Sequence, residues 1–408
     1  MTKTRTALGD SHNFGRRVVL REGRVSKPRT VFWEWLVLAK DSPLRRVLDE
    51  VAALDGLGND YFGFLPTLEF HSPRAREGGE VERIALNPLP SLSNHEKGVL
   101  AAIVGRSLAL FSWLGVADLH WENLVLGIDA SGRMVFGPLD VEMILADLSL
   151  PTETKLLPDA DPEYAAVCRH ACGVRRVLPY LGKPVAVSEL LRMASAYRAT
   201  LDVLGRHASA IAGAFAGLPE LAETPIRVCL RGTDEYVQSS AEPLWPPLLE
   251  AEEEQLLRGD IPYFFRLYGR RGIHYYGDPG LEQLKTLPLE GDVPQLDPML
   301  KISRELSSPT RKKLRDEGLF TLLGAFDHST FVGEQANDEL EVTFRARTLV
   351  VKLAGGEELE SRRNLSAFVG SVYLPCQCGE VRSVFVPAVT VCQPTAGPFS
   401  ANRVRRLR

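Results

Sequence analysis

Two polar side chains lie five residues apart, directly after a long apolar stretch, and their types suit phosphoryl transfer. Asp118 offers a carboxylate that could take the proton of an attacking hydroxyl group. Asn123 offers an amide oxygen that could hold Mg²⁺ over the phosphates of a nucleotide. Asp140, seventeen residues further on, supplies the second oxygen ligand that such a metal needs. The spacing therefore predicts a phosphoryl-transfer site that uses ATP and Mg²⁺.

The same five-residue interval separates the catalytic-loop Asp and the metal-binding Asn of protein kinases. In this interpretation His120 belongs to the catalytic loop, and residues 134–136 form the strand that delivers Asp140. Glu142 could assist the metal or face solvent. The structural alternative is that residues 118–123 are only a polar loop at a helix end, and the position of Asp140 weighs against it.

A kinase-like site also needs a lysine on a strand of its small lobe to contact the nucleotide phosphates. Lys27 ends a short β-type run at residues 24–27 and could serve this purpose. The glycine-rich loop of protein kinases does not precede it. A turn-rich stretch at residues 9–15 takes that place and contains Asp10 and His12. This difference separates the chain from ordinary protein kinases.

Six segments resemble the dehydratase domain of the class II lanthipeptide synthetases, the LanM family. They are residues 9–18 (GDSHNFGRRV), 27–29 (KPR), 118–123 (DLHWEN), 139–142 (LDVE), 227–236 (RVCLRGTDEY) and 254–264 (EQLLRGDIPYF). Ser26 differs from the family, which has an aromatic residue before the lysine. The segments follow the family's order over residues 9–264.

The resemblance implies a reaction and the residues that perform it. Members of that family phosphorylate Ser and Thr of a precursor peptide with ATP and then eliminate the phosphate, which leaves a dehydroamino acid. The residues implied for phosphorylation are Lys27, Asp118, His120, Asn123 and Asp140. Those implied for elimination are Asp10, His12, Arg227 and Thr233. An arginine fork suits a departing phosphate, and a histidine can carry the proton.

Structural alternatives stay open for three of these residues. Arg227 could form a surface salt bridge, Thr233 could cap a turn, and His12 could make a hydrogen bond within its loop. Three functions also stay open: a LanM-like dehydratase, a kinase that stops at the phosphate on a peptide, protein or small molecule, and a non-catalytic protein that binds a nucleotide or partner. Intact Asp118, Asn123 and Asp140 weigh against the third.

Full-length family members carry a long segment before this opening and a zinc cyclase after the dehydratase. Here the matching region starts at Gly9, and the cysteines 376, 378 and 392 do not resemble the cyclase ligands. Their number and spacing also do not suit a structural zinc site, which usually has four ligands. We therefore expect a stand-alone dehydratase, with ring closure left to a separate cyclase.

The hydrophobic pattern predicts the elements that must position these residues. We expect an α+β, kinase-like bilobal fold with a small β-rich N-lobe (1–90), a larger helical C-lobe (91–330) and a strand-rich C-terminal module (331–408) of unknown role. Expected helices cover residues 42–54, 95–114, 163–178, 187–205 and 248–257, and expected strands cover 18–20, 24–27, 340–344, 348–353, 372–374 and 384–386. Residues 72–80 are expected to form an exposed loop. Glu50 is the expected partner of Lys27.

Composition limits the binding partners and the cellular location that we expect for the protein. The net charge of −4 offers no basis for nucleic-acid binding, and the basic run at residues 403–408 is short. No signal peptide is evident at the N-terminus, and no apolar run reaches the ~18 residues of a membrane span. We therefore expect a cytoplasmic protein with reduced thiols, no membrane span, and a precursor peptide or another hydroxyl-bearing molecule as substrate.

Overall fold

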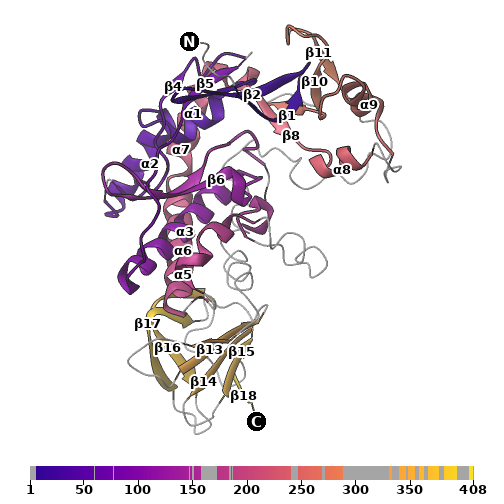
Figure 1. Ribbon diagram of the computed structural model, residues 1–408. Coiled ribbons are helices and arrows are strands. Elements are labelled where there is room, and N and C mark those ends of the chain that lie inside the picture. Colours follow the sequence, from indigo (N-terminus) through magenta and orange to yellow (C-terminus); the bar gives the residue numbers. More distant parts are fainter. Residues whose placement is uncertain are drawn as a thin grey trace.

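The computed structural model describes residues 6–287, apart from residues 59, 77, 147, 149–150, 158–171, 183–184, 186, 240–246 and 269–271. Beyond residue 287 it describes only strands between residues 330 and 407. The described part is a mixed α+β structure, which confirms the predicted fold class, and its sheets are small and antiparallel (Figure 1).

The N-terminal sheet has the strand order β1-β2-β3-β5-β4. Its strands are β1 (Thr6–His12), β2 (Arg16–Arg21), β3 (Arg24–Lys27), β4 (Phe70–His71) and β5 (Gly79–Glu82). This confirms both predicted strands. The predicted loop at residues 72–80 is shorter, because Gly79 pairs with Lys27. A Cβ at Gly79 would come within 2.4 Å of Val31, so the close approach requires glycine.

Three helices follow or interrupt this sheet: α1 (Phe32–Leu38), α2 (Pro43–Leu54) and α3 (Asn94–Leu114). Ser93 begins α3 with a capping box, in which its side chain and that of Glu96 satisfy each other's backbone N–H groups. Helix α3 ends at Gly115, whose φ of 66° is the left-handed conformation that glycine adopts without strain. The predicted helices at residues 42–54 and 95–114 are thus confirmed.

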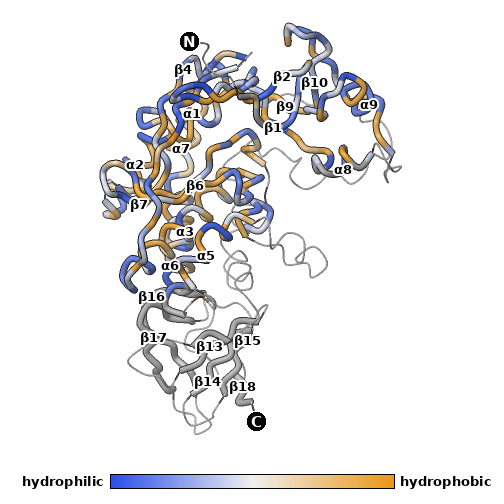
Figure 2. The backbone as a smooth tube through the Cα atoms, viewed as in Figure 1, coloured by the Kyte–Doolittle hydropathy of each residue, from blue (hydrophilic) through white to orange (hydrophobic). Residues whose placement is uncertain are grey.

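Helix α3 packs against α6 (Val187–Arg206), which confirms the helix predicted at residues 187–205. The two backbones approach so closely that a Cβ at Gly105 would lie 2.1 Å from the carbonyl oxygen of Met193. Although the sequence predicted no apolar run long enough for a membrane span, α3 is long and apolar enough to cross a membrane by length and composition, and 78% of its most apolar 18-residue window is buried inside the structure. Hydrophobic residues of α3 and α6 belong to one buried core cluster (Figure 2).

Between α3 and α6 the chain forms the short helix η1 (Trp121–Asn123) and the hairpin β6 (Leu124–Ile128) and β7 (Met134–Pro138). A second sheet has the order β11-β10-β9-β8, with β8 (Pro225–Val228), β9 (Phe264–Leu267), β10 (His274–Tyr276) and β11 (Leu284–Thr286). The other helices are η2 (Pro151–Thr154), η3 (Gly173–Arg176), α5 (Leu178–Leu181), α7 (Ala208–Ala216), η4 (Pro219–Glu223), α8 (Thr233–Gln238) and α9 (Glu250–Leu257). The helix predicted at 248–257 is confirmed as α9, whereas most of the one predicted at 163–178 lies outside the described residues.

The C-terminal region contains the predicted strands and three that were not predicted. They are β12 (Thr330–Val332), β13 (Leu340–Arg345), β14 (Thr348–Leu353), β15 (Glu358–Arg362), β16 (Ser366–Pro375), β17 (Val381–Cys392) and β18 (Val404–Leu407). Strands β16 and β17 pair as a hairpin, and the others form one sheet in the order β12-β13-β14-β15-β18. Cys392 ends β17, while Cys376 and Cys378 lie outside the described residues.

Candidate functional site

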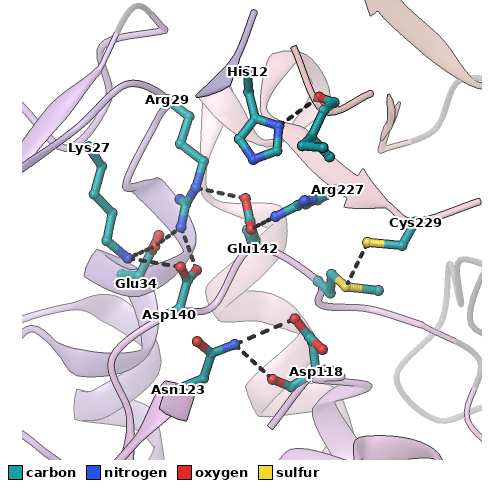
Figure 3. Close-up of polar contacts among 12 residues, drawn as sticks. His12, Lys27, Arg29, Glu34, Asp118, Asn123, Asp140, Glu142, Arg227 and Cys229 are labelled. Atoms are coloured by element: carbon teal, nitrogen blue, oxygen red, sulfur yellow. Dashed lines mark hydrogen bonds and ion pairs between the residues drawn. The ribbon is translucent and has the colours of Figure 1, made fainter. Parts of the chain in front are cut away.

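The predicted catalytic loop connects α3 to β6 and brings Asp118 and Asn123 into contact. The Nδ2 atom of Asn123 donates to the backbone carbonyl of Asp118 at 3.0 Å and lies 3.4 Å from its Oδ2 atom. The amide oxygen of Asn123 is therefore turned away from Asp118, on the side of Asp140 (Figure 3). The backbone N–H of Leu139 donates to the carbonyl of Asn123, which fixes the Asp140 segment beside the loop.

Lys27 reaches this loop from β3 and is nearly fully buried. Its Nζ atom donates to Glu34 Oε1 at 2.9 Å and to the carbonyl of Leu139 at 3.1 Å, and it lies 3.3 Å from Asp140 Oδ2. Glu34 of α1 is thus the glutamate that pairs with Lys27. The prediction of Glu50 was wrong, because that side chain is exposed on α2.

Arg29 is a site residue to which the sequence analysis gave no role. Its guanidinium contacts three carboxylates: Glu34 at 2.6 Å, Glu142 at 2.7 Å, and Asp140 (Figure 3). Its side chain is 11% exposed. Burial acts to lower the pKa of Arg29, but the three carboxylates outweigh it and raise that pKa well above its usual value. Arg29 is therefore a permanent cation among these acids.

Asp140 is held as a carboxylate by the cations around it. Burial would raise the pKa of Asp140, but Arg29, Lys27 and Arg227 outweigh burial and hold the pKa well below its usual range. The carboxylate is therefore charged at every physiological pH. A negative charge is what a metal ligand and an ion-pair partner both require.

Arg227, on β8, joins the same group of charges through Glu142. Its guanidinium donates to the carboxylate of Glu142. Its backbone N–H donates to the backbone carbonyl oxygen of the same residue. The indole of Trp33 on α1 donates to the carbonyl of Pro225 at 2.7 Å, which fastens β8 to α1. Arg227 thus forms an ion pair that is largely buried, with 17% of the arginine side chain and 13% of the glutamate side chain exposed. The six side chains Lys27, Arg29, Glu34, Asp140, Glu142 and Arg227 are called the charge cluster below.

His12 lies at the edge of the charge cluster with a defined tautomer. Its Nδ1 atom is 2.8 Å from the carbonyl oxygen of Ile261. A carbonyl only accepts, so Nδ1 carries the proton and Nε2 presents a lone pair, turned toward Glu142 and Arg227 (Figure 3). Burial lowers the pKa of His12, and Arg227 lowers it further. The imidazole is therefore neutral at pH 7. Asp10, which is exposed on β1, raises the pKa of His12 only weakly.

Two segments 249 residues apart fix the position of His12. Asp260 accepts hydrogen bonds from the Ser11 hydroxyl at 2.7 Å and from the backbone N–H groups of Phe14 and Gly15. The N–H of Ile261 donates to the carbonyl of Ser11 at 2.8 Å. The structure thus brings residues 9–18 and 254–264, two of the six resembling segments, into direct contact.

The two remaining predicted residues lie outside the charge cluster. Thr233 is the first residue of α8, and the structure gives no hydrogen bond between it and the other predicted site residues, all of which lie in the described part. His120 caps η1, where its Nδ1 atom accepts from the N–H of Glu122 at 3.4 Å. Of the residues implied for phosphorylation, Lys27 lies 3.3 Å from Asp140 and the Asp140 segment is hydrogen-bonded to Asn123 through Leu139, whereas among the described residues the structure gives no contact between His120 and Asp140.

The donor set near Asp140 suits Mg²⁺ only together with phosphates. Asp140 offers a carboxylate and Asn123 an amide oxygen, and Mg²⁺ commonly takes one or two protein oxygens while phosphates and water supply the rest. Among the described residues, no group of three His, Cys, Asp or Glu side chains could hold a metal by itself. Glu142 contacts two arginines, so its metal-ligand role stays a prediction.

The chain matches no protein-family model, and it has no significant match among curated proteins. The function must therefore be inferred from the residues of the site. Three cations and three carboxylates form the charge cluster, and a neutral imidazole, the Asp118 carboxylate and the Asn123 amide border it. Such a group can bind a phosphate-bearing molecule and move a proton beside it.

We expect Arg29→Met to lower the free energy of unfolding by about 3–5 kcal/mol, because it removes the cation that lies between three carboxylates and leaves each of them with only one of its two cationic partners. Arg21→Met is the matched control. Arg21 also donates to a glutamate, Glu80, at 2.6 Å, but its side chain is 46% exposed, so the loss should stay below ~1 kcal/mol. Urea unfolding followed by tryptophan fluorescence measures both. Equal losses of unfolding free energy in the two variants would show that the buried ion pairs of Arg29 stabilise the fold no more than an exposed ion pair does.

Proposed function

We propose that the chain is a LanM-like dehydratase that phosphorylates Ser and Thr of a ribosomally made peptide with Mg-ATP and then eliminates the phosphate. The observation that carries this proposal is the pairing of Arg29 with both Asp140 and Glu142, while Glu142 also pairs with Arg227. Residues implied for phosphorylation and for elimination therefore share one charge cluster. A phosphate made beside Asp140 lies within reach of the elimination residues.

In this proposal the sheet β1–β5 with α1 acts as a kinase-like N-lobe over the helical part. Lys27 binds the nucleotide phosphates, and Asp118 accepts the proton of the attacking hydroxyl. Asn123 and Asp140 would hold Mg²⁺, which neutralises charge on the phosphates when it is bound. The acceptor oxygen forms a bond to the γ-phosphorus as the bond from that phosphorus to ADP breaks.

Elimination needs a base and a group that stabilises the departing phosphate. His12 fits the first role, because its neutral Nε2 atom is a proton acceptor at pH 7. It takes the α-proton, the freed electron pair forms the Cα–Cβ double bond, and the Cβ–O bond breaks with its electrons going to phosphate. Arg227 fits the second role, since a guanidinium can exchange the Glu142 carboxylate for phosphate oxygens.

A kinase that stops at the phosphate is the second candidate. Thr233, implied for elimination, makes no hydrogen bond to Arg227 or His12 in the described part, and Arg227 is engaged by Glu142. Both observations favour a protein in which the elimination residues do not act together. The two candidates predict different products from the same substrate.

The test is the intact mass of a Ser/Thr-rich precursor peptide encoded near this gene and co-expressed with the protein. Loss of water, once per modified residue, is the expected result. Gain of phosphate without loss of water would replace the dehydratase by the kinase. Neither mass change, together with no ATP turnover on any hydroxyl acceptor, would contradict both.

A further inference from the structure

Lys155 lies against Asp118 although 37 residues separate them in the chain. Its Nζ atom donates to Asp118 Oδ1 at 2.9 Å, while Asn123 faces the other carboxylate oxygen. The Lys155 side chain is 55% exposed, and that of Asp118 is 28% exposed. The pair is thus partly open to solvent.

The backbone holds Lys155 in this place from both sides. The N–H of Leu119 donates to the carbonyl of Thr154 at 2.9 Å, and the N–H of Gly173 donates to the carbonyl of Lys155 at 3.0 Å. Thr154 and Leu156, its neighbours in sequence, are fully buried. Lys155 is therefore an outward side chain on a segment that is fixed to the catalytic loop.

Both partners have an unusual backbone conformation. Asp118 has a φ of 62° and Lys155 a φ of 61°, and only seven non-glycine residues in the described part have a positive φ. A side chain with a Cβ is strained there, and glycine would adopt these angles more easily. Such strain concentrates at functional sites. Here it directs an ammonium and a carboxylate toward each other.

Two other cations of the site, Lys27 and Arg29, contact carboxylates of the charge cluster. Lys27 contacts Glu34 and lies beside Asp140, and Arg29 contacts three carboxylates. Among the described residues, Lys155 is the lysine or arginine that both contacts Asp118 and is more than half exposed. In the proposed function the acceptor hydroxyl binds at Asp118, beside this ammonium.

We propose that Lys155 is a catalytic residue whose ammonium contacts the transferred phosphoryl group while it positions the Asp118 carboxylate. This rests on the proposed phosphoryl transfer. The acceptor O–H proton goes to Asp118, the acceptor oxygen bonds to phosphorus, and the bond to the ADP oxygen breaks. Lys155 keeps its protons throughout and stabilises charge on the phosphoryl oxygens. One such donor is worth about 10²–10³ in rate in well-studied enzymes.

The test compares Lys155→Met, Lys155→Arg and the control Lys285→Met in the full chain. Lys285 on β11 forms an exposed ion pair of similar length with Glu254, at 2.8 Å. Lys285→Met therefore removes the same type of ion pair at a place away from Asp118. Single-turnover release or transfer of the γ-phosphoryl group from Mg-ATP measures the rate. Titration with Mg-ATP measures the dissociation constant.

We expect Lys155→Met to lower the rate about 100-fold and to leave the dissociation constant unchanged. Lys155→Arg should recover a large part of the rate, because a cation returns to the same place, and Lys285→Met should match the wild type. The rate ratio of ATP to ATPγS should fall in Lys155→Met, since a phosphoryl oxygen has lost its partner. A merely structural lysine would not change that ratio.

If the wild-type protein is active, two results would overturn this inference. Wild-type rates in Lys155→Met would remove the catalytic role alone. Equal loss in Lys155→Met and Lys155→Arg, with weaker Mg-ATP binding, would show that Lys155 only supports the loop. If the wild-type protein transfers no phosphoryl group from Mg-ATP to peptide or water, the proposed function fails, and the role of Lys155 fails with it.

Discussion

Asp140→Asn is expected to lower Mg-ATP-dependent phosphoryl transfer on the order of 10³-fold, because a metal contributes several kcal/mol to stabilising the transferring group. Asparagine keeps the shape of the side chain and removes its charge. The substitution would take the carboxylate from Mg²⁺ and also remove one counter-charge from Lys27 and from Arg29, both of which keep Glu34. The rate of phosphate or dehydroamino-acid formation on the co-expressed peptide measures the effect.

Asp129→Asn on the same hairpin is the control. Asp129 also lies in a dense set of hydrogen bonds, from Ser131 and Arg133, but at the β6–β7 turn and away from Asn123. It should retain transfer at close to the wild-type rate. Transfer by Asp140→Asn at the wild-type rate would remove Asp140 from the nucleotide and metal assignment. A higher Mg²⁺ requirement in Asp140→Asn alone would support it.

Sequence reasoning worked best for elements whose signals are local. The hydrophobic period located α2 and α3, with Ser42 at the start of the first and Gly115 at the end of the second, and the structure adds the capping box of Ser93 and Glu96 at the start of α3. The hairpin that carries Asp140 followed from a turn between two β-type runs. These features need no knowledge of the rest of the chain, which is why they could be predicted.

Helix α1 and the partner of Lys27 were missed for one reason. Residues 31–38 are a nearly continuous apolar run, and α1 is buried on most sides, so no helical period distinguishes it. Glu34 lies within this run as a single buried acid. With α1 unseen, the next helix supplied Glu50 as the partner, although that residue faces solvent. Arg29 escaped for a similar reason, since nothing local shows that three distant carboxylates meet it.

Long-range contacts needed the structure. The hydrogen bonds of Asp260 to Ser11 and Gly15 span about 245 residues or more, and Lys155 reaches Asp118 over 37. Spacing along the chain carries no information about such pairs. The family resemblance implied functional roles for residues in these segments, but it did not indicate which of the residues are in contact. The charge cluster is the part of the site that only folding defines.

Arg227→Ala is expected to stop elimination and let the phosphorylated peptide accumulate. The substitution removes the guanidinium that would bind the departing phosphate, while Lys27, Asp118 and Asn123 stay in place for transfer. Mass spectrometry of the co-expressed peptide should show gain of phosphate where the wild type shows loss of water. Loss of one charged donor to phosphate predicts about a 10²–10³-fold slower elimination.

Arg231→Ala separates this effect from simple destabilisation. Arg231 also forms a buried ion pair, with Glu252 at 2.9 Å, and lies four residues further along, but it does not contact His12 or Glu142. If lost stability explained the result, both variants would accumulate the same products.

Arg227→Ala should also act on His12, because Arg227 lowers the pKa of that imidazole. Removing the arginine raises the pKa of His12, so more of the imidazole is protonated and unable to accept a proton at a given pH. Any residual elimination should therefore recover only at a higher pH than in the wild type, and identical products and pH profiles in wild type and Arg227→Ala would exclude a role for Arg227 in elimination.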